Sequence, residues 1–451
     1  MKKRSSMINP PRARAAAYFA ALLLSLLAGA AHTATAQKKI SGYDIERGRS
    51  MLGTIKSELE KNYYDPTFKG LDVQALFKQA DEMIKGAQSN GQIFGIIAHV
   101  LIQLDDSHTF FMPPGRVTRV DYGWEMQMVG DKCYVVALKP GSDAAAKGLK
   151  EGDEVISLDG MTPIRQDFWK LGYLYRTLRP VPGLRLVARS PGGQPRELEI
   201  LTKLSEGKKV TDLTDYNEYM RLVVREERDA RLRRHRYYEL GEELFIWKMP
   251  QFDLPKEKVD DMAGKLRKFK SVILDLRGNG GGAEETLLRM IGNFVERDVK
   301  IGDLRRRKEI RPLVAKSVGK DAYQGKLIVL LDSESGSSSE LFARVMQMES
   351  RATVIGDRSM GAVMRGRHYG HQFGIDTVSF YGVSITDADL LMSDGKGLEG
   401  AGVTPDELLL PTPADMAARR DPVLARAASL AGVELTPEKA GTLFPVEWRK
   451  N

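Results

Sequence analysis

The sequence contains a single cysteine, and this scarcity excludes several kinds of chemistry at once. Cys133 cannot form a disulfide within the chain, because no second thiol is present. Its neighbours Tyr134, Val135 and Val136 indicate a buried strand position rather than a reactive thiol. The sequence has neither an HExxH motif nor paired Cys/His spacing. We therefore expect no metal and no cofactor.

A strong excess of one charge sign is also absent once the N-terminus is set aside. The formal net charge is +8 over 451 residues. Five of those positive charges, with no acidic residue among them, lie at Lys2, Lys3, Arg4, Arg12 and Arg14. Their removal would leave about +3, well mixed in sign. This balance gives no reason to expect nucleic acid as a partner.

The N-terminus has the three regions of a secretory signal. Its cations precede an apolar run at 15–31, and Ala34-Thr35-Ala36 follows as a small-residue cleavage site. We predict a signal peptide over residues 1–36, a periplasmic or extracellular mature chain, and no stable membrane insertion after cleavage. A retained membrane anchor is the alternative, although the apolar run is short for a bilayer span. No cysteine stands directly after the run, which argues against a lipid anchor.

Three segments are expected to be helical. Apolar residues recur at helical spacing within 45–104, which predicts an N-terminal helical domain over residues 37–112. Interleaved arginine and glutamate within 212–236 predict a charged helical linker over 206–240. A helical tail is expected over 413–451. Together with the β-rich and α/β segments described next, these helices predict a mixed α+β and α/β multidomain protein.

The segment between the helical domain and the linker is rich in short β-like runs. Residues 139–160, KPGSDAAAKGLKEGDEVISLDG, resemble a PDZ domain in their order of strand, Pro-Gly-Ser turn, Ala-rich helix and Gly-Asp turn. A PDZ-like domain is therefore expected over 113–205. The loop at 122–125 lies about where such a domain binds a peptide carboxylate, but Glu125 is an unusual neighbour for a carboxylate.

Apolar strand-length runs alternate with helical patterns over residues 241–412. This alternation predicts an α/β domain with a largely parallel sheet. The expected strands are 244–249, 271–276, 326–331 and 352–355, and the expected helices are 256–269, 283–296 and 339–348.

Ser339 lies where the apolar run 326–331 gives way to a helical pattern. Backbone N–H groups at a helix start lack partners and carry partial positive charge, so they can stabilise an anion that forms on a substrate carbonyl. The position therefore suits a hydrolase nucleophile. The alternative is ordinary helix capping, since Ser335, Ser337 and Ser338 stand in the same cluster.

A glycine-rich loop, DLRGNGGG at 275–282, closes another expected strand. Consecutive glycines allow a main-chain N–H to approach a ligand closely. The loop lacks the spacing of a phosphate-binding motif. It is therefore either an oxyanion-binding loop or a plain sharp turn.

Four motifs in order resemble the C-terminal processing peptidase and tricorn-core family of serine peptidases. They are DLRGNGGG at 275–282, SSSE at 337–340, RATVIG at 351–356 and GVTPD at 402–406. A PDZ-like segment ahead of them strengthens the resemblance, which covers nearly all of the mature chain. It implies a catalytic core of the ClpP/crotonase type over 241–412.

The resemblance also implies roles for particular residues. Ser339, directly before Glu340, would be the nucleophile, and the backbone N–H groups of Gly281 and Glu340 would form the oxyanion hole. The processing-peptidase branch uses a lysine as general base in a Thr-x-Gly-Lys-Gly segment. This chain has Ala362 at that position, so a Ser/Lys dyad is excluded there.

His108 is then the expected general base. It stands in a polar Asp-Asp-Ser-His-Thr turn, and imidazole is the usual base for a serine. The tricorn-like branch has a Ser-His pair ahead of its PDZ-like region, which Ser107 and His108 match. By the same resemblance Glu399 and Ser107 would orient the ring. The alternatives are a surface histidine at a helix end and a plain loop carboxylate.

These observations predict an exported serine endopeptidase or processing peptidase. Ser339 would attack a peptide bond with His108 as base, and the partners would be peptides or unfolded protein segments. One rival is a peptidase-fold protein that has lost hydrolysis and binds peptides or apolar ligands. A second is an esterase, which the missing G-x-S-x-G motif disfavours. The sequence gives no indication of oligomeric state.

Overall fold

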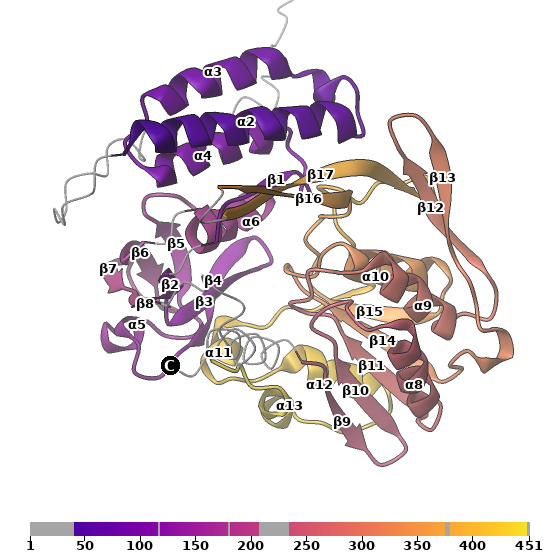
Figure 1. Cartoon of the computed structure of the whole chain (residues 1–451). Coiled ribbons are helices and arrows are strands. Elements are labelled where there is room, and N and C mark those ends of the chain that lie inside the picture. Colours follow the sequence, from indigo (N-terminus) through magenta and orange to yellow (C-terminus); the bar gives the residue numbers. More distant parts are fainter. Residues whose placement is uncertain (1–39, 116–117, 179–180, 207–233, 375–378, 449–451) are drawn as a thin grey trace, which may run out of the picture. The chain divides into compact units, whose positions relative to one another are not determined.

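The computed structural model describes residues 40–115, 118–178, 181–206, 234–374 and 379–448 (Figure 1). The predicted signal peptide and most of the charged segment lie outside these residues. The chain divides into two compact units. The first contains residues up to 114 together with 366–373 and 379–387, and the second contains 115–365 and 388 onward.

The first unit is built on three helices, α2 (Gly42–Asn62), α3 (Val73–Lys85) and α4 (Asn90–Ile102), with a short 3-10 turn, η1 (Phe68–Gly70). Each α-helix begins at a side-chain cap, because Ser41, Asp72 and Ser89 accept a hydrogen bond from a first-turn N–H. The apolar stripes of the three helices are buried, which confirms the helical pattern predicted here. The buried residues of these stripes include Met51, Ile55, Leu59, Phe77, Ile84, Ile97 and Leu101.

Three strands complete the first unit. After α4 the chain turns into β1 (Phe110–Met112), which pairs antiparallel with β17 (Ser379–Met392). β16 (Arg365–Phe373) also pairs with β17. The first half of β17 thus fixes the segment that follows α4, where Ser107 and His108 lie.

The second unit begins with a five-stranded antiparallel sheet whose strands pair in chain order. They are β3 (Trp124–Val129), β4 (Lys132–Leu138), β5 (Glu154–Leu158), β6 (Gly183–Arg189) and β7 (Arg196–Leu201). Short helical segments connect them: α5 (Asp143–Ala146), η2 (Arg165–Asp167), α6 (Phe168–Tyr173) and the π-helical turn η3 (Leu174–Leu178). A separate ribbon pairs β2 (Thr118–Asp121) with β8 (Lys203–Glu206). We refer to residues 118–206 as the β3–β7 module.

A six-stranded sheet forms the centre of the second unit, in the order β18-β15-β14-β11-β10-β9. Its strands are β9 (Arg236–Leu240), β10 (Leu244–Lys248), β11 (Ser271–Asp275), β14 (Lys326–Leu331), β15 (Ala352–Gly356) and β18 (Glu407–Leu408). All are parallel except β9. The predicted α/β alternation is confirmed.

One boundary in the sequence-based assignment is wrong. Residues 236–240 were assigned to the charged helical linker, whereas they form β9, an antiparallel edge strand on β10. The exposure of β9 alternates along the strand, because one face is open to solvent. A strand of this kind carries charged residues in its sequence, which explains the misassignment.

Both faces of the six-stranded sheet are covered by helices (Figure 1). α8 (Lys256–Leu266), α9 (Glu284–Phe294) and α10 (Ser338–Met348) pack on one face, against alternate strand residues such as Phe245, Leu274 and Val329. α12 (Pro422–Leu430) and α13 (Pro437–Leu443) pack on the other, against Ile246, Ile273 and Ile328. Burial on both faces explains why these strands are continuous apolar runs.

The remaining elements of the second unit are smaller. A hairpin of β12 (Val299–Arg305) and β13 (Ile310–Ala315) pairs with the last residues of β17. The 3-10 turn η4 (Gly319–Asp321) and the helix α11 (Pro413–Ala417) lie in connecting segments. No helix among the described residues is both long enough and apolar enough to span a bilayer.

Candidate active site

Two neighbouring parallel strands deliver the serine cluster and the glycine loop to one edge of the sheet. β11 and β14 pair in register, so the loops that follow them open from the same end. The two loops are hydrogen-bonded to each other. The N–H of Gly336 donates to the carbonyl of Asn279 at 2.9 Å, and the Ser335 hydroxyl donates to the carbonyl of Leu276 at 2.9 Å.

The glycine loop packs against Ser337 so closely that no side chain fits between them. Gly281 has φ +103°, and a Cβ built on it would lie 2.6 Å from the Ser337 Cβ. At Gly282 a Cβ would lie 2.3 Å from the Phe252 carbonyl oxygen. The run of glycines is therefore required by the approach of the serine turn on one side and of a backbone segment on the other.

Ser337 occupies a strained turn between β14 and α10. Its φ of +52° and ψ of −117° are unusual for a residue with a side chain. In α/β-hydrolases a sharp strand-to-helix turn places the nucleophile where substrate can reach it. The backbone is held there by two bonds, since the Ser337 N–H donates to the Ala362 carbonyl at 2.8 Å and to Glu340 Oε2 at 2.9 Å.

The next two serines are enclosed. Ser339 is fully buried, and its hydroxyl donates to the Asn279 carbonyl at 2.8 Å. Ser338 is also buried, and its hydroxyl donates to the Gly282 carbonyl at 3.2 Å. Ser337 is more exposed, and its hydroxyl donates no hydrogen bond within the described residues. Of the three hydroxyls, that of Ser337 is the one available for chemistry.

The two N–H groups predicted to form the oxyanion hole are already used. The Gly281 N–H donates to Asn279 Oδ1 at 2.8 Å, and the Glu340 N–H donates to the Ser337 carbonyl at 2.9 Å. In the described part of the chain, the N–H groups of Gly280 and Ser338 have no acceptor. Ser338 is the first residue of α10, where the helix dipole favours a negative charge.

Glu340 connects the serine turn to the segment after β15. It is fully buried, and its carboxylate accepts from the Ser337 N–H, the Ser359 hydroxyl, the Gly361 N–H and the Ala362 N–H at 2.9, 2.5, 2.7 and 2.9 Å. Burial raises the pKa of Glu340 to about 7, and the hydrogen bonds to its charged form oppose this rise.

Residue 362 therefore lies directly beside the serine turn, and it is an alanine. Its backbone exchanges bonds with Ser337 and Glu340, so a lysine at this position would be close to the serine. Glu399, the predicted orienting carboxylate, follows β17 in the chain and contacts the two residues after Ala362. Its Oε2 accepts from the N–H groups of Val363 at 2.7 Å and Met364 at 3.3 Å.

His108 lies in the first unit, in the turn between α4 and β1. Ser107 Oγ is 2.7 Å from its Nδ1, so the serine contacts the ring. Burial lowers the pKa of His108 to about 4, although the nearby Asp106 carboxylate opposes this effect. The imidazole is consequently neutral at pH 7 and able to accept a proton.

Asp106, which is not among the site residues predicted from the sequence, fixes the turn that contains His108. This buried carboxylate accepts from the backbone N–H groups of His108 and Thr109 and from the hydroxyls of Tyr63 and Thr386. The distances are 3.1, 2.7, 2.8 and 2.6 Å in that order. The sequence does carry a signal for this role. An aspartate side chain often accepts a hydrogen bond from the backbone N–H of the residue two positions later, and Asp106 stands two positions before His108.

Comparisons with known proteins show what this chain is similar to. The family model described as "Peptidase family S41" matches residues 246–409. The chain is 25% identical over 320 residues to a "Tail-specific protease" of Haemophilus influenzae, which covers 67% of this chain and 43% of that protein. It is 23% identical over 380 residues to a chloroplastic "C-terminal processing peptidase" of Tetradesmus obliquus, covering 78% and 75% of the two chains.

A solved structure shows the same fold. Mature CPAF matches with a TM-score of 0.62 at 15% identity, covering 83% of this chain and 95% of that one. The matching family model is one of peptidases, the two relatives are named as a protease and a peptidase, and the CPAF structure shares the fold. The match to the model of peptidase family S41 runs from β10 to β18, the part of the chain that contains the serine turn and the glycine loop. The chain spans about half the length of the first two curated relatives that it matches, 43% and 52%.

Proposed function

We propose that the chain is an exported serine endopeptidase or processing peptidase that cleaves peptides or unfolded protein segments through an acyl-enzyme. The observation that carries the proposal is the Ser337 turn, with an available hydroxyl beside two N–H groups that have no acceptor within the described residues. Residues 1–36 would act as the export signal, and the β3–β7 module would be a PDZ-like domain over 113–205. The names of the relatives from Haemophilus and Tetradesmus support a processing role.

The nucleophile in this proposal is Ser337, two residues before the serine that the sequence predicted. Ser339 would have to give up its bond to the Asn279 carbonyl and leave a fully buried position before it could attack. Ser337 needs no such change. The developing oxyanion would accept from the N–H groups of Ser338 and Gly280, in place of those of Glu340 and Gly281.

His108 would take the proton from the nucleophile and later give it to the leaving amine. Its lowered pKa keeps the ring in the accepting form at pH 7. Ser107 would fix the orientation of the ring through Nδ1. Glu399 would stabilise the imidazolium, as the family resemblance implies.

A serine scan tests the nucleophile. Casein and quenched fluorescent peptides serve as substrates for the variants Ser337→Ala, Ser338→Ala and Ser339→Ala. We expect Ser337→Ala to lower kcat by at least about a thousandfold, and Ser339→Ala to lower it by less than about tenfold. A serine-directed phosphonate should label Ser337, as mapped by mass spectrometry.

Each other outcome of the scan is informative. Labelling of Ser339, with activity lost only in Ser339→Ala, would restore the sequence-based assignment. A parent chain that neither cleaves nor reacts with the phosphonate would favour the rival, a peptidase-fold binding protein.

Substitutions of two histidines, one at a time, test the assignment of the general base. His108→Ala should lower kcat by at least about a thousandfold. His368→Ala is the matched control, since this histidine lies near His108 but is exposed. Equal activity in the two variants would exclude His108 as the base.

A further inference from the structure

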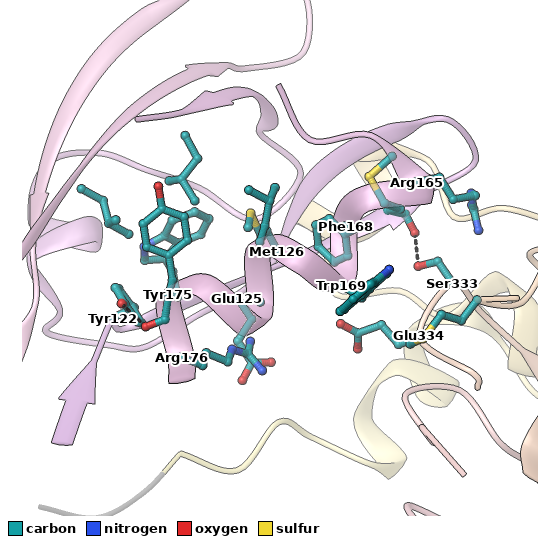
Figure 2. A pocket seen from close by; sticks show the side chains of 17 residues that line it. Tyr122, Glu125, Met126, Arg165, Phe168, Trp169, Tyr175, Arg176, Ser333 and Glu334 are labelled. Atoms are coloured by element: carbon teal, nitrogen blue, oxygen red, sulfur yellow. Dashed lines mark hydrogen bonds between the residues drawn. The ribbon is translucent and has the colours of Figure 1, made fainter. Parts of the chain in front are cut away.

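A pocket in the second unit is lined by aromatic, methionine and acidic side chains (Figure 2). It has about 150 Å³ of space for water-sized molecules. The β3–β7 module supplies most of its lining, including Trp124 and Met126 from β3 and Phe168 and Trp169 from α6. The segment before the serine turn supplies Ser333 and Glu334, and Met360 also lines it.

Some of the residues that line the pocket lie next to the serine turn. Met360 lines the pocket, and a Cβ built on Gly336, the residue before Ser337, would lie 3.4 Å from the Met360 Sδ. The Ser333 hydroxyl donates to the Met128 carbonyl at 2.6 Å, which ties the same segment to β3 (Figure 2). A peptide whose side chain fills the pocket would therefore run close to Ser337.

Two carboxylates and two arginines line the pocket, and the two arginines are Arg165 and Arg176. Glu334 and Glu125 line it, and Asp332 lies close to Glu334. Burial raises the pKa of Glu334, and the charges of Asp332 and Glu125 raise it further, while Arg176 and Lys248 oppose the rise. A cation placed beside Glu334 would relieve this unfavourable environment.

Two nearby cations, Arg165 and Lys248, do not supply this charge, because their charged ends are bound to other groups. Arg165 lines the pocket, but its guanidinium donates to Asp357 Oδ2 and to the carbonyls of Gly130 and Arg358. Lys248 is bound to Asp275 at 3.2 Å and to the Arg277 carbonyl at 2.6 Å. Arg176 is then the one lining cation whose charge opposes the carboxylates.

A second observation indicates a ligand. The indole of Trp124 is only 6% exposed, and its Nε1–H has no acceptor within the described residues. A buried donor without an acceptor is costly, and most such groups in native proteins find a partner. The carbonyl of an extended peptide would supply the missing acceptor.

We propose that this pocket binds a lysine or arginine side chain of the substrate, with the charged end at Glu334 and Glu125. The aliphatic stem of such a side chain packs on Trp169 and Phe168, and aromatic faces attract cations as well. The proposal rests on the proposed function, since it names the substrate class of that peptidase. It can nevertheless be tested by binding alone.

The test uses the full chain with Ser337→Ala and Ser339→Ala, so that no peptide is cleaved. Fluorescein-labelled alanine hexapeptides carry lysine, norleucine or glutamate at each position in turn, and fluorescence anisotropy gives each Kd. Norleucine keeps the stem of lysine and lacks its charge. At one position or more, we expect lysine to bind about tenfold more tightly than norleucine.

Glu334→Gln should reduce this lysine-to-norleucine ratio to near one, and Glu334→Lys should make the glutamate peptide the tighter binder. Glu199→Gln is the matched control, because Glu199 is an exposed carboxylate of the same module that does not line the pocket. It should leave the ratio unchanged.

Two results would overturn the proposal. One is equal binding of lysine and norleucine peptides at every position. The other is binding that depends on a free peptide carboxylate and on Arg176, but not on Glu334 or Glu125. Lysine selection in a chain whose parent form cleaves nothing would refute the peptidase function and leave the pocket assignment standing.

Discussion

The backbone N–H of Ser337 donates to Oε2 of Glu340 across 2.9 Å, and this bond joins the proposed nucleophile to a buried carboxylate. Four groups donate to that carboxylate, and three of them are backbone N–H groups, which cannot accept a hydrogen bond. The ionised form fits this arrangement, whereas a protonated carboxyl would direct an O–H group at a donor. The geometry of the serine turn thus depends on the ionisation of Glu340.

The pH dependence of activity follows from this relationship. Since the pKa of Glu340 is raised to about 7, lowering the pH through 7 protonates it and loosens the turn. We expect kcat/KM to fall on the acid side with a midpoint near pH 7. The pKa of His108, about 4, would place a limb set by the base much lower. Peptide cleavage between pH 4 and pH 9 distinguishes the two.

Ser359→Ala identifies the group that sets the acid limb. The Ser359 hydroxyl donates to Glu340 Oε1 at 2.5 Å and stabilises the charged form. Its removal should raise the pKa of Glu340 further and move the limb to higher pH. Ser429→Ala, an exposed serine of α12, is the control. A limb near pH 4 that Ser359→Ala does not move would contradict this account.

The glycine loop gives a second prediction. In Gly281→Ala, the new methyl group would lie 2.6 Å from the Ser337 Cβ. The alanine would also have to adopt a φ of +103°, which is unfavourable for a residue with a side chain. We expect a loss of about 1–3 kcal/mol in the free energy of unfolding and a fall in kcat of about a hundredfold or more. Urea unfolding and peptide cleavage measure the two effects.

Gly264→Ala in α8 is the matched control, since a Cβ at Gly264 meets nothing within 4 Å and the residue lies outside the serine turn and the glycine loop. It should stay within about tenfold of the parent rate, given that core and backbone constraints are absent at this position. If both variants behave alike, the close packing of Gly281 on Ser337 does not matter for catalysis.

The strands and helices around the site could be read from the sequence because each carries a local pattern. The run Lys326–Leu331 is apolar throughout, since both faces of β14 are covered, and it was predicted at its observed bounds. The apolar stripe of α10 likewise predicted that helix to within one residue. β9 was missed because one of its faces is open to solvent and its sequence resembles that of the charged linker.

The choice among the serines could not be made locally. Ser337, Ser338 and Ser339 are chemically identical, and all lie at the same helix start. Which hydroxyl is available depends on the carbonyl of Asn279, which is 60 residues away in the chain and accepts from Ser339. The positive φ of Ser337 is imposed by contacts with the glycine loop and with Ala362, which no local pattern encodes.

A third prediction concerns the turn that holds His108. Asp106→Ala would leave two N–H groups and two hydroxyls without their acceptor. We expect a cost of about 3–5 kcal/mol in the free energy of unfolding, as for other disrupted buried charge networks. Tyr63→Phe removes one donor and keeps the carboxylate, so it should cost about 1 kcal/mol. Urea unfolding followed by circular dichroism measures both, and equal costs would show that Asp106 does not organise the turn.

The last prediction concerns Arg165, which joins the β3–β7 module to the segment after β15. Arg165 and Asp357 form an ion pair whose side chains are each 9% exposed, and the guanidinium also donates to the carbonyls of Gly130 and Arg358. Removing one partner of a buried pair leaves the other charge uncompensated. Arg165→Met should therefore cost about 3–5 kcal/mol in the free energy of unfolding.

The surface pair of Arg185 and Glu197 provides the comparison within the same module. Its side chains are 60% and 59% exposed at a separation of 3.5 Å, so solvent screens their attraction. Arg185→Met should cost less than about 1 kcal/mol. A double-mutant cycle of Arg165→Met with Asp357→Asn should give a coupling of about 1–3 kcal/mol. If Arg165→Met costs no more than Arg185→Met in urea unfolding, the buried pair does not stabilise the attachment of the module.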